Sequence, residues 1–304
     1  MRRSWPAAAS HAAVFISGES GTGKEILARY LRRHSPRHEN VFVALNCAAL
    51  PETLADSQLF GHIRGAFTGA VADQRGYLEL AQGGTLFLDE IEELKADAQA
   101  KLLRVLEDHK LRRLGSARET VVDVRLLAAA QKEPEQLVKE GKLRQDLFFR
   151  LGAIHLRLPP LRERTEDIAG LALHFLNCLS REIKKAIGGI EPEALDLLRK
   201  YPWPGNVREL KNVLERAAIF VRPGERVRLS ELPEKMRGTP GIAAFTVEAS
   251  PPPTLEELTD RYIQFVQGHC EGNQAQVARI LGVSATTLWR HRVKNSDASP
   301  EENA

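Results

Sequence analysis

The stretch AVFISGESGTGKEILARY, residues 13–30, decides the fold of this chain. Its apolar start predicts a strand, and GESGTGK at residues 18–24 predicts a glycine-rich turn. A helical pattern follows over 24–34. This order is typical of a phosphate-binding loop, whose backbone N–H groups and helix N-terminus face phosphate oxygens. A chance glycine turn is the alternative, because Glu25 stands where Ser or Thr is usual. The predicted nucleotide-binding residues are Gly18, Glu19, Ser20, Gly21, Thr22, Gly23, Lys24 and Glu25.

Three further apolar runs indicate an α/β protein. They are VFVALN at 41–46, GTLFLDE at 84–90 and VVDVRLLAAA at 121–130, with helical patterns such as 97–108 between them. Runs without polar alternation predict strands buried on both faces, as in a parallel sheet between helices. The carboxyl edge of such a sheet is where ligands bind.

Asp89 and Glu90 stand at that edge, at the end of one predicted strand. In a nucleotide site, Asp89 would hold Mg²⁺, directly or through water, and Glu90 would orient and polarise the attacking water. The alternative is a pair of acids that caps the next helix. Together with the glycine-rich loop, the two acids predict hydrolysis of ATP.

The later part of the chain changes character. Strand signals end near residue 168, and helical patterns follow over 168–185, 193–200 and 206–220. A stretch rich in proline, glycine and small residues then reads as a linker. We predict an α/β domain over 1–163, a helical lid over 164–231, a linker over 232–253, a small helical domain over 254–295 and a disordered tail over 296–304.

Composition describes an ordinary globular protein. Of 304 residues, 43% are hydrophobic and 27% charged. Cys47, Cys178 and Cys270 are widely spaced, which argues against a disulfide framework or a zinc site and favours a reducing, cytoplasmic environment. No apolar run is long enough to cross a membrane, and the formal net charge of +3 says little about partners.

GHIRGAFTGA, residues 61–70, mounts one bulky ring, Phe67, among small residues. Glycine weakens both strands and helices, so the segment predicts a loop. Taken alone, it favours a turn with Phe67 folded back into the core.

GNQAQVARILGVSATTLWRHRVK, residues 272–294, has the outline of a helix-turn-helix, with a helix over 274–281, a turn at Gly282 and a second helix capped by Ser284. The segment contains no acid, and its basic residues are Arg279, Arg290, Arg292 and Lys294. It predicts binding to double-stranded DNA; the alternative is a small bundle with a solvated basic face. The residues predicted to contact bases or phosphates are Ser284, Ala285, Thr286, Thr287, Arg290, Arg292 and Lys294.

The chain resembles the AAA+ central domain of bacterial enhancer-binding proteins, the activators of sigma-54 RNA polymerase. The resemblance runs from about Val14 to Val221 and rests on GESGTGKE, NCAAL, LFGHIRGAFTGA, GGTLFLDEI, LPPLRER and WPGNVRELKN. Residues 272–294 resemble the Fis-type DNA-binding domain that closes these activators. The resemblance implies a P-loop ATPase with a helical lid, assembled as a ring, expected to be a hexamer, that binds upstream DNA and remodels the closed complex of sigma-54 RNA polymerase. A dimer through the helix at 255–267 is a further expectation.

The resemblance also implies roles for single residues. Asn46 matches the asparagine that restrains the catalytic glutamate, here Glu90, until the nucleotide state changes; its alternative is a turn residue that caps the next segment. Arg144 and Arg150 match arginine fingers that reach a neighbouring subunit's ATP, and on one helix they would point about 120° apart. Arg208 matches the sensor II arginine. The loop that would contact sigma-54 consists of Gly65, Ala66, Phe67, Thr68, Gly69 and Ala70.

Two departures from the family pattern stand out. Ala130 and Gln131 occupy the positions of a usual Thr-Asn pair, so we expect weaker nucleotide sensing or slower hydrolysis unless Gln131 substitutes in part. Few residues precede the first strand, which suggests a fragment or control from elsewhere. Two alternative functions therefore stay open. One is a DNA-binding regulator with weak ATPase activity, and the other is an AAA+ remodeller of another protein. The intact GAFTGA argues against the remodeller.

Overall fold

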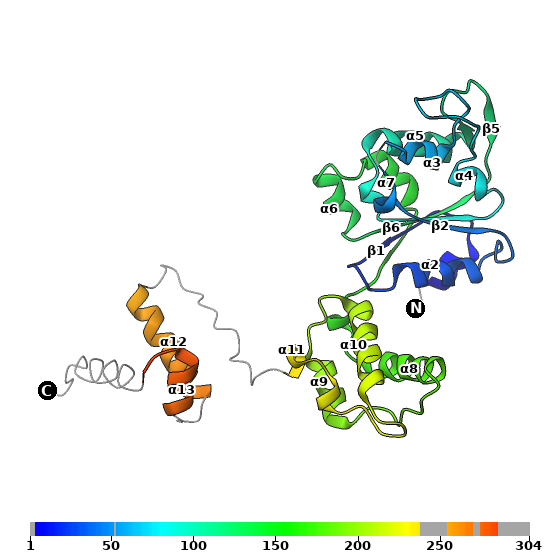
Figure 1. Cartoon of the computed structure of the whole chain (residues 1–304). Coiled ribbons are helices and arrows are strands. Elements are labelled where there is room, and N and C mark those ends of the chain that lie inside the picture. Colours follow the sequence, from blue (N-terminus) through cyan, green and yellow to red (C-terminus); the bar gives the residue numbers. More distant parts are fainter. Residues whose placement is uncertain (1–3, 52, 238–253, 270–273, 285–304) are drawn as a thin grey trace. The chain divides into compact units, whose positions relative to one another are not determined.

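The computed structural model describes residues 4–51, 53–237, 254–269 and 274–284. The chain divides into two compact units, Met1–Met236 and Arg237–Ala304. The first unit holds a sheet with its helices and a helical subdomain, and the second holds a pair of helices (Figure 1).

A five-stranded parallel sheet forms the centre of the first unit, with the strand order β2-β3-β6-β1-β7. The strands are β1 Val14–Ser17, β2 Phe42–Asn46, β3 Thr85–Asp89, β6 Arg125–Ala130 and β7 Ile154–Arg157. All of β1 and β6 is buried, as predicted for strands covered on both faces. Because β3, β6 and β1 are direct neighbours, the loops that follow them meet at one edge of the sheet.

Helices cover both faces of this sheet. Figure 1 shows α2 on one face and α5, α6 and α7 on the other. Their bounds are α2 Lys24–Arg33, α5 Ala96–Asp108, α6 Pro134–Lys139 and α7 Gln145–Leu151. Since alternate residues of a strand point to opposite faces, Val14 and Ile16 pack in the apolar cluster beneath α2, whereas Phe15 packs in the cluster beneath α5 and α7. The predicted α/β architecture is confirmed.

The other elements around the sheet are short. They are α1 Ser4–Ala9, the 3-10 turns η1 Cys47–Ala49 and η2 Ile91–Glu93, α3 Ala55–Phe60, α4 Tyr77–Leu80, β4 Lys110–Arg112 and β5 Glu119–Val121. β4 and β5 pair antiparallel as a separate two-stranded ribbon.

The strand predictions need two corrections. The single strand predicted over 121–130 is two elements, since β5 ends at Val121 and β6 begins at Arg125. β7 was not predicted. It lies at the edge of the sheet and is mostly not buried, so its sequence IHLR lacks the continuous apolar run that identified the central strands.

A helical subdomain with its own core completes the first unit. Its elements are η3 Leu161–Glu163, α8 Asp167–Glu182, α9 Pro192–Lys200, α10 Asn206–Phe220, η4 Leu229–Glu231 and α11 Glu234–Arg237. Trp203 is fully buried in this core, and its indole Nε1 donates to the carbonyl of Leu198 at 2.7 Å. The polar atom of the ring is therefore satisfied. The three helices predicted here match α8, α9 and α10 to within a few residues.

The second unit contains α12, Leu255–His269, and α13, Gln274–Leu281. The two helices pack through the buried side chains of Val266 and Val277. Gly282 follows α13 with a φ of +67°, a left-handed conformation that glycine adopts readily. Ser284 is exposed, and the rest of the predicted second helix, with the other predicted DNA contacts, lies outside the described residues.

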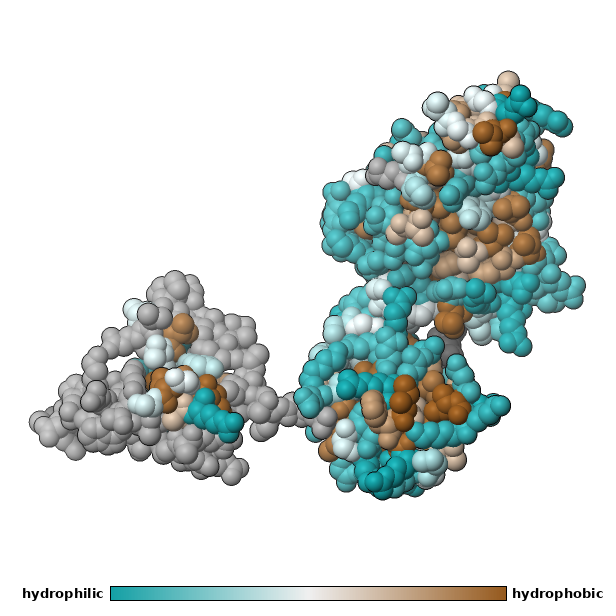
Figure 2. Space-filling view, viewed as in Figure 1, coloured by the Kyte–Doolittle hydropathy of each residue, from teal (hydrophilic) through white to brown (hydrophobic). Residues whose placement is uncertain are grey.

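Hydrophilic surface covers most of the described first unit in the view of Figure 2, with apolar side chains gathered in separate patches. Within the described residues, no helix combines the length and apolar character that a membrane crossing requires.

Candidate functional site

Three loops that follow neighbouring strands meet at the carboxyl edge of the sheet. They are the glycine-rich loop after β1, the pair Asp89 and Glu90 after β3, and Gln131 after β6. The backbone N–H of Gly18 donates to the carbonyl of Ala130 at 3.2 Å, which ties the start of the first loop to β6. The topology thus brings together the loop and the two acids that the sequence singled out.

The glycine-rich loop folds around the ammonium group of Lys24. Only 7% of Lys24 is exposed, and its Nζ donates to the carbonyls of Gly18 at 2.7 Å and Glu19 at 3.3 Å. Burial lowers the pKa of Lys24, while nearby carboxylates, first that of Asp89, act in the opposite direction. A buried cation at a helix N-terminus is suited to an anionic ligand.

Backbone conformation explains two of the glycines in this loop. Gly21 and Gly23 have φ values of +77° and +103°. A Cβ atom on Gly21 would lie 2.5 Å from the carbonyl oxygen of Gly205, so a side chain there would collide with the helical subdomain. Only glycine fits at this point of contact.

The acids at the end of β3 interact with Lys24 and with each other. Burial raises the pKa of Asp89, the positive charge of Lys24 acts against this rise, and the backbone N–H of Glu90 donates to Asp89 Oδ1 at 3.1 Å. Burial also raises the pKa of Glu92, which lies one turn farther on. Glu90 has a left-handed backbone, φ +55° and ψ +50°, a strained conformation that is enriched at functional sites.

The side chain of Glu90 is held by Gln131. Gln131 Nε2 donates to Glu90 Oε1 at 2.9 Å, and the backbone N–H of Gln131 donates to Glu92 Oε1 at 2.7 Å. Asn46, which the family resemblance assigned to this role, instead accepts from the N–H of Ala48 at 2.8 Å and caps η1. Across the described residues, no hydrogen bond joins Asn46 to Glu90. The cap uses only Oδ1 of Asn46, and a role of its Nδ2 toward Glu90 stays a prediction.

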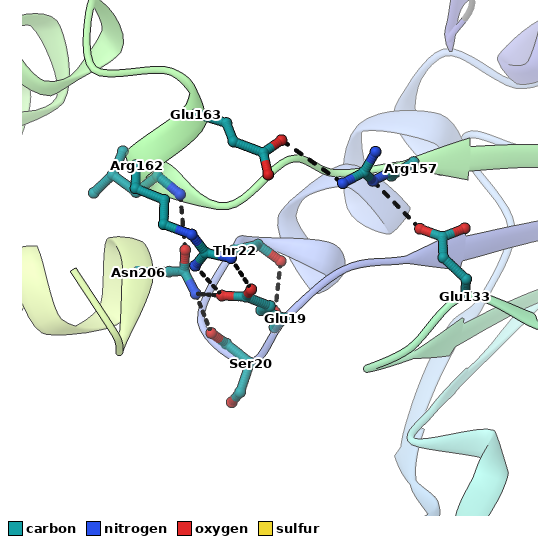
Figure 3. A network of polar contacts seen from close by, with 9 residues as sticks. Glu19, Ser20, Thr22, Glu133, Arg157, Arg162, Glu163 and Asn206 are labelled. Carbon is teal, nitrogen blue, oxygen red and sulfur yellow. Dashed lines mark hydrogen bonds and ion pairs between the residues drawn. The ribbon is translucent and has the colours of Figure 1, made fainter. Parts of the chain in front are cut away.

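The carboxylate of Glu19 is hydrogen-bonded by two elements of the helical subdomain, η3 and α10 (Figure 3). Arg162 of η3 donates two hydrogen bonds to its carboxylate, at 2.9 and 2.5 Å, and Asn206 Nδ2 at the start of α10 donates a third at 3.1 Å. These hydrogen bonds, that of Arg162 first, lower the pKa of Glu19 to about 2. Asn206 is fully buried, and its Oδ1 accepts from the N–H of Leu161 at 2.8 Å.

The loop also caps helix α10. The carbonyl of Gly21 accepts from the backbone N–H groups of Val207 at 3.0 Å and Arg208 at 3.3 Å. These are donors at a helix N-terminus that have no partner within the helix. Arg208 Nη1 donates to Ser20 Oγ at 3.2 Å, so the predicted sensor II arginine does lie against the phosphate-binding loop. We call this set of contacts among Glu19, Gly21, Arg162, Asn206 and Arg208 the loop–lid junction.

An apolar cavity of about 680 Å³ adjoins the glycine-rich loop at Thr22 and Gly23. It lies between α2 and α8, and its walls include Ile26, Leu27, Tyr30, Leu171, His174 and Phe175. Its volume is within the usual range of small-molecule sites. Glu25, predicted to bind nucleotide, lies on the exposed side of α2 and pairs with Arg29 at 2.6 Å.

The two predicted arginine fingers are exposed, but only one is helical. Arg144 precedes α7 in an extended conformation, held there because its N–H donates to Gln99 Oε1 at 2.9 Å, and its guanidinium pairs with Asp146 at 2.6 Å. Arg150 lies within α7 and donates to the carbonyl of Leu106 at 2.7 Å. The expectation that both arginines project from one helix, about 120° apart, is therefore wrong.

The loop Gly65–Ala70 is a tight turn on the surface. The N–H of Gly65 donates to the carbonyl of Ala70 at 2.9 Å, and both Gly65 and Gly69 have left-handed backbones. Phe67 is 37% exposed, and its ring meets that of buried His62 edge-on, with 5.0 Å between the centroids. Thr68 is exposed. The ring rests on His62 rather than in the core.

Sequence reasoning assigned no role to Arg162 and Asn206, although both lie in the quoted segments LPPLRER and WPGNVRELKN. A signal was available. An acid inside a phosphate-binding loop opposes an anionic ligand unless a cation neutralises it, so Glu19 predicts a basic partner from elsewhere in the chain.

A family model for the sigma-54 interaction domain matches residues 2–157. The chain belongs to the sigma-54 interaction domain family. Models for the AAA+ ATPase lid domain and for the bacterial regulatory protein, Fis family, match residues 162–244 and 254–292. The fold is that of an AAA+ P-loop NTPase with a helical lid, followed by a Fis-type helix-turn-helix domain, as predicted.

Relatives of this family match most of the chain. Regulatory protein AtoC of Escherichia coli K12 is 45% identical over 287 residues, and transcriptional regulatory protein ZraR of Klebsiella oxytoca is 44% identical over 281, each match covering 92% of this chain. The chain spans 62% and 63% of their lengths. The crystal structure of Brucella abortus NtrX in complex with ADP is 29% identical, covers 97% of this chain and 66% of NtrX, and has a TM-score of 0.72.

Proposed function

We propose that this chain is a cytoplasmic, sigma-54-dependent transcriptional activator that hydrolyses ATP and binds upstream DNA. The observation that carries the proposal is the convergence of the buried Lys24 ammonium with Asp89 and Glu90 at one sheet edge. A cation for the phosphates, a carboxylate for a metal and a second carboxylate for water are the parts that phosphoryl transfer requires.

The residues present fit a nucleotide. Lys24 and the N–H groups at the start of α2 would bind the phosphates, and the apolar cavity of about 680 Å³ beside Thr22 would receive the base. ATP supplies a phosphoanhydride bond whose cleavage releases free energy. Similar NtrX crystallised with ADP and with ATP, which supports the assignment.

Asp89 is the proposed Mg²⁺ ligand. Across the described residues, no group of three or more His, Cys, Asp or Glu side chains could hold a metal by itself. This fits Mg²⁺, which usually binds through one or two carboxylates together with substrate phosphates and water. Glu90 would then orient the attacking water and accept its proton.

Arg144 and Arg150 are proposed to act on the nucleotide of a neighbouring subunit. Both are exposed. A site completed by a neighbour's arginine requires at least a second subunit, and we propose a ring, expected to be a hexamer. Arg208 and the loop–lid junction would report lid position to the nucleotide within the subunit.

The loop Gly65–Ala70 is the proposed contact with sigma-54. Phe67 and Thr68 are exposed at its tip, and the small residues beside them allow close approach of a partner. The Fis-type domain, with Ser284 and the basic residues after it, would bind DNA, with α12 pairing two subunits.

ATP hydrolysis measured against protein concentration tests the catalytic part. We expect turnover per subunit to rise as rings form, and Glu90→Gln to keep nucleotide binding but lose turnover. Glu93→Gln, the same change at an exposed acid three residues farther on, is the control. Absence of turnover at every concentration would instead favour the second candidate, a DNA-binding regulator of this fold with weak ATPase activity, which the Ala130 and Gln131 departure motivates.

A further inference from the structure

A cavity of about 430 Å³ lies beside the loop Gly65–Ala70. Its walls come from α3 and the residue before it, from the loop itself, and from the stretch 71–74 that follows the loop. It shares no lining residue with the apolar cavity beside Thr22. The cavity is therefore separate from the nucleotide site and adjoins the loop proposed to contact sigma-54.

Hydrogen bonds fix the floor of this cavity. The N–H of His62 donates to the carbonyl of Gln74 at 3.0 Å, and the N–H of Gln74 donates to the carbonyl of His62 at 2.9 Å. Ser57 Oγ and His62 Nδ1 hydrogen-bond at 2.7 Å, and both residues are buried. The floor is thus formed in the chain by itself, which lowers the cost of ordering a surface on binding.

Three apolar side chains around the cavity are exposed. They are Leu54 from the residue before α3, Phe67 from the loop and Val71 just after the loop. Val71 is 86% exposed. Apolar side chains scattered singly over a surface are ordinary, but several around one hollow are typical of an interaction site.

The charge of the lining restricts what can bind. Among the described residues that line the cavity there is no Lys or Arg, and Asp73 is the only carboxylate. Asp73 Oδ1 already accepts from the N–H of Arg64 at 2.8 Å. The amides of Gln58 and Gln74 offer uncharged donors and acceptors. A phosphate backbone requires cations, so this lining favours an apolar, uncharged segment of a protein over nucleic acid.

We infer that this cavity receives an apolar side chain of the partner that the loop Gly65–Ala70 engages, an inference that rests on the proposed function and its partner, sigma-54. The partner's segment packs between Leu54 and Val71 and against the ring of Phe67. Its neighbouring backbone groups meet the amides of Gln58 and Gln74. The loop is then one wall of a docking site whose other wall is α3.

Binding of fluorescently labelled sigma-54, measured by anisotropy with Mg²⁺ and a non-hydrolysable ATP analogue, tests this inference. Val71→Asp places a charge at the apolar wall, so the dissociation constant should rise at least about tenfold. Leu54→Ser removes apolar surface without adding a charge and should weaken binding by a smaller factor. Val71→Ile stays apolar and should keep most of the affinity. Ile219→Asp, at an exposed aliphatic position of α10, is the control and should bind as the unaltered protein does.

Sedimentation of the same proteins separates the outcomes. Equal binding of sigma-54 by Val71→Asp, Leu54→Ser and the unaltered protein would overturn the docking site while leaving the proposed function intact. Smaller assemblies of Val71→Asp would assign the cavity to a contact between copies of this chain and would also overturn it. Absence of binding by the unaltered protein would instead refute the proposed function, and the docking site with it.

Discussion

Two glycine-rich loops of this molecule, residues 18–23 and 65–70, have similar compositions and opposite surroundings. The first is held from outside, because η3 and α10 reach it through Arg162, Asn206 and the amides that Gly21 caps. The second is closed mainly by its own turn, rests on the ring of His62 and lies against Gly115 through Ala66. Glycine permits a turn in both; contacts from other elements decide which turn is fixed.

This difference suits two tasks. A phosphate-binding loop must keep its N–H groups in place, and the loop–lid junction does so while joining the loop to the helical subdomain. A loop that engages a partner must expose its anchor, and Phe67 is exposed at 37%. Substitutions in and around each loop measure how firmly it is held.

The largest effect is expected at the cation of the first loop. Lys24→Ala removes the buried cation proposed to meet the outer phosphates within the subunit, so ATP affinity should fall at least about a hundredfold, consistent with the loss of a desolvated charge-assisted contact. Isothermal titration with ATP and Mg²⁺ measures it. Lys139→Ala, at an exposed position of α6, should leave affinity unchanged, and equal affinity in the two variants would refute the assignment of Lys24.

Asn206 is expected to contribute most to the stability of the loop–lid junction. Asn206→Ala removes the hydrogen bonds to Glu19 and to the N–H of Leu161. It also places alanine at a left-handed φ of +51°. Together these changes should lower the free energy of unfolding by about 2–4 kcal/mol. Urea unfolding gives the value. Asn206→Gly tolerates the backbone and should lose only the hydrogen-bond part, so identical losses in the two variants would rule out the strain component.

Phe67→Ala should hardly affect folding. The ring is partly exposed and contacts His62 through one edge, so the expected loss is below about 1 kcal/mol, much less than for a buried core aromatic. The same urea titration measures it beside Phe60→Ala, which empties a buried site. A loss as large as that of Phe60→Ala would mean that Phe67 is a core residue.

The smallest effect concerns pH. The pKa of Glu19 is lowered to about 2, so the folded state binds this proton less tightly than the unfolded state. Its contribution to stability is complete above the usual pKa near 4.5 and is lost as pH falls toward 2. The difference in Tm between the unaltered protein and Glu19→Gln should therefore shrink between pH 7 and pH 3. The difference in Tm between the unaltered protein and Arg162→Ala should shrink over the same pH range. A Tm difference that is constant with pH would count against the contact between Arg162 and Glu19.

The sequence predicted what depends on local pattern. Continuous apolar runs identified β1, β2 and β3, and the glycines located the phosphate-binding loop, because burial and left-handed turns restrict residue type directly. Contacts between residues that are far apart in the sequence were harder to predict. The positions of Asn46 and Gln131 around Glu90 depend on strand order, and the extended backbone at Arg144 depends on a contact from Gln99 that no spacing reveals.

We propose that ATP bound at the anchored loop drives the exposed loop against sigma-54. Open-complex formation on a sigma-54 promoter, followed by permanganate footprinting with ATP, tests this most directly. We predict promoter opening with the unaltered protein, none with Lys24→Ala, and none with Thr68→Ala although that variant still hydrolyses ATP. Full promoter opening by Thr68→Ala, or opening without ATP, would contradict the account.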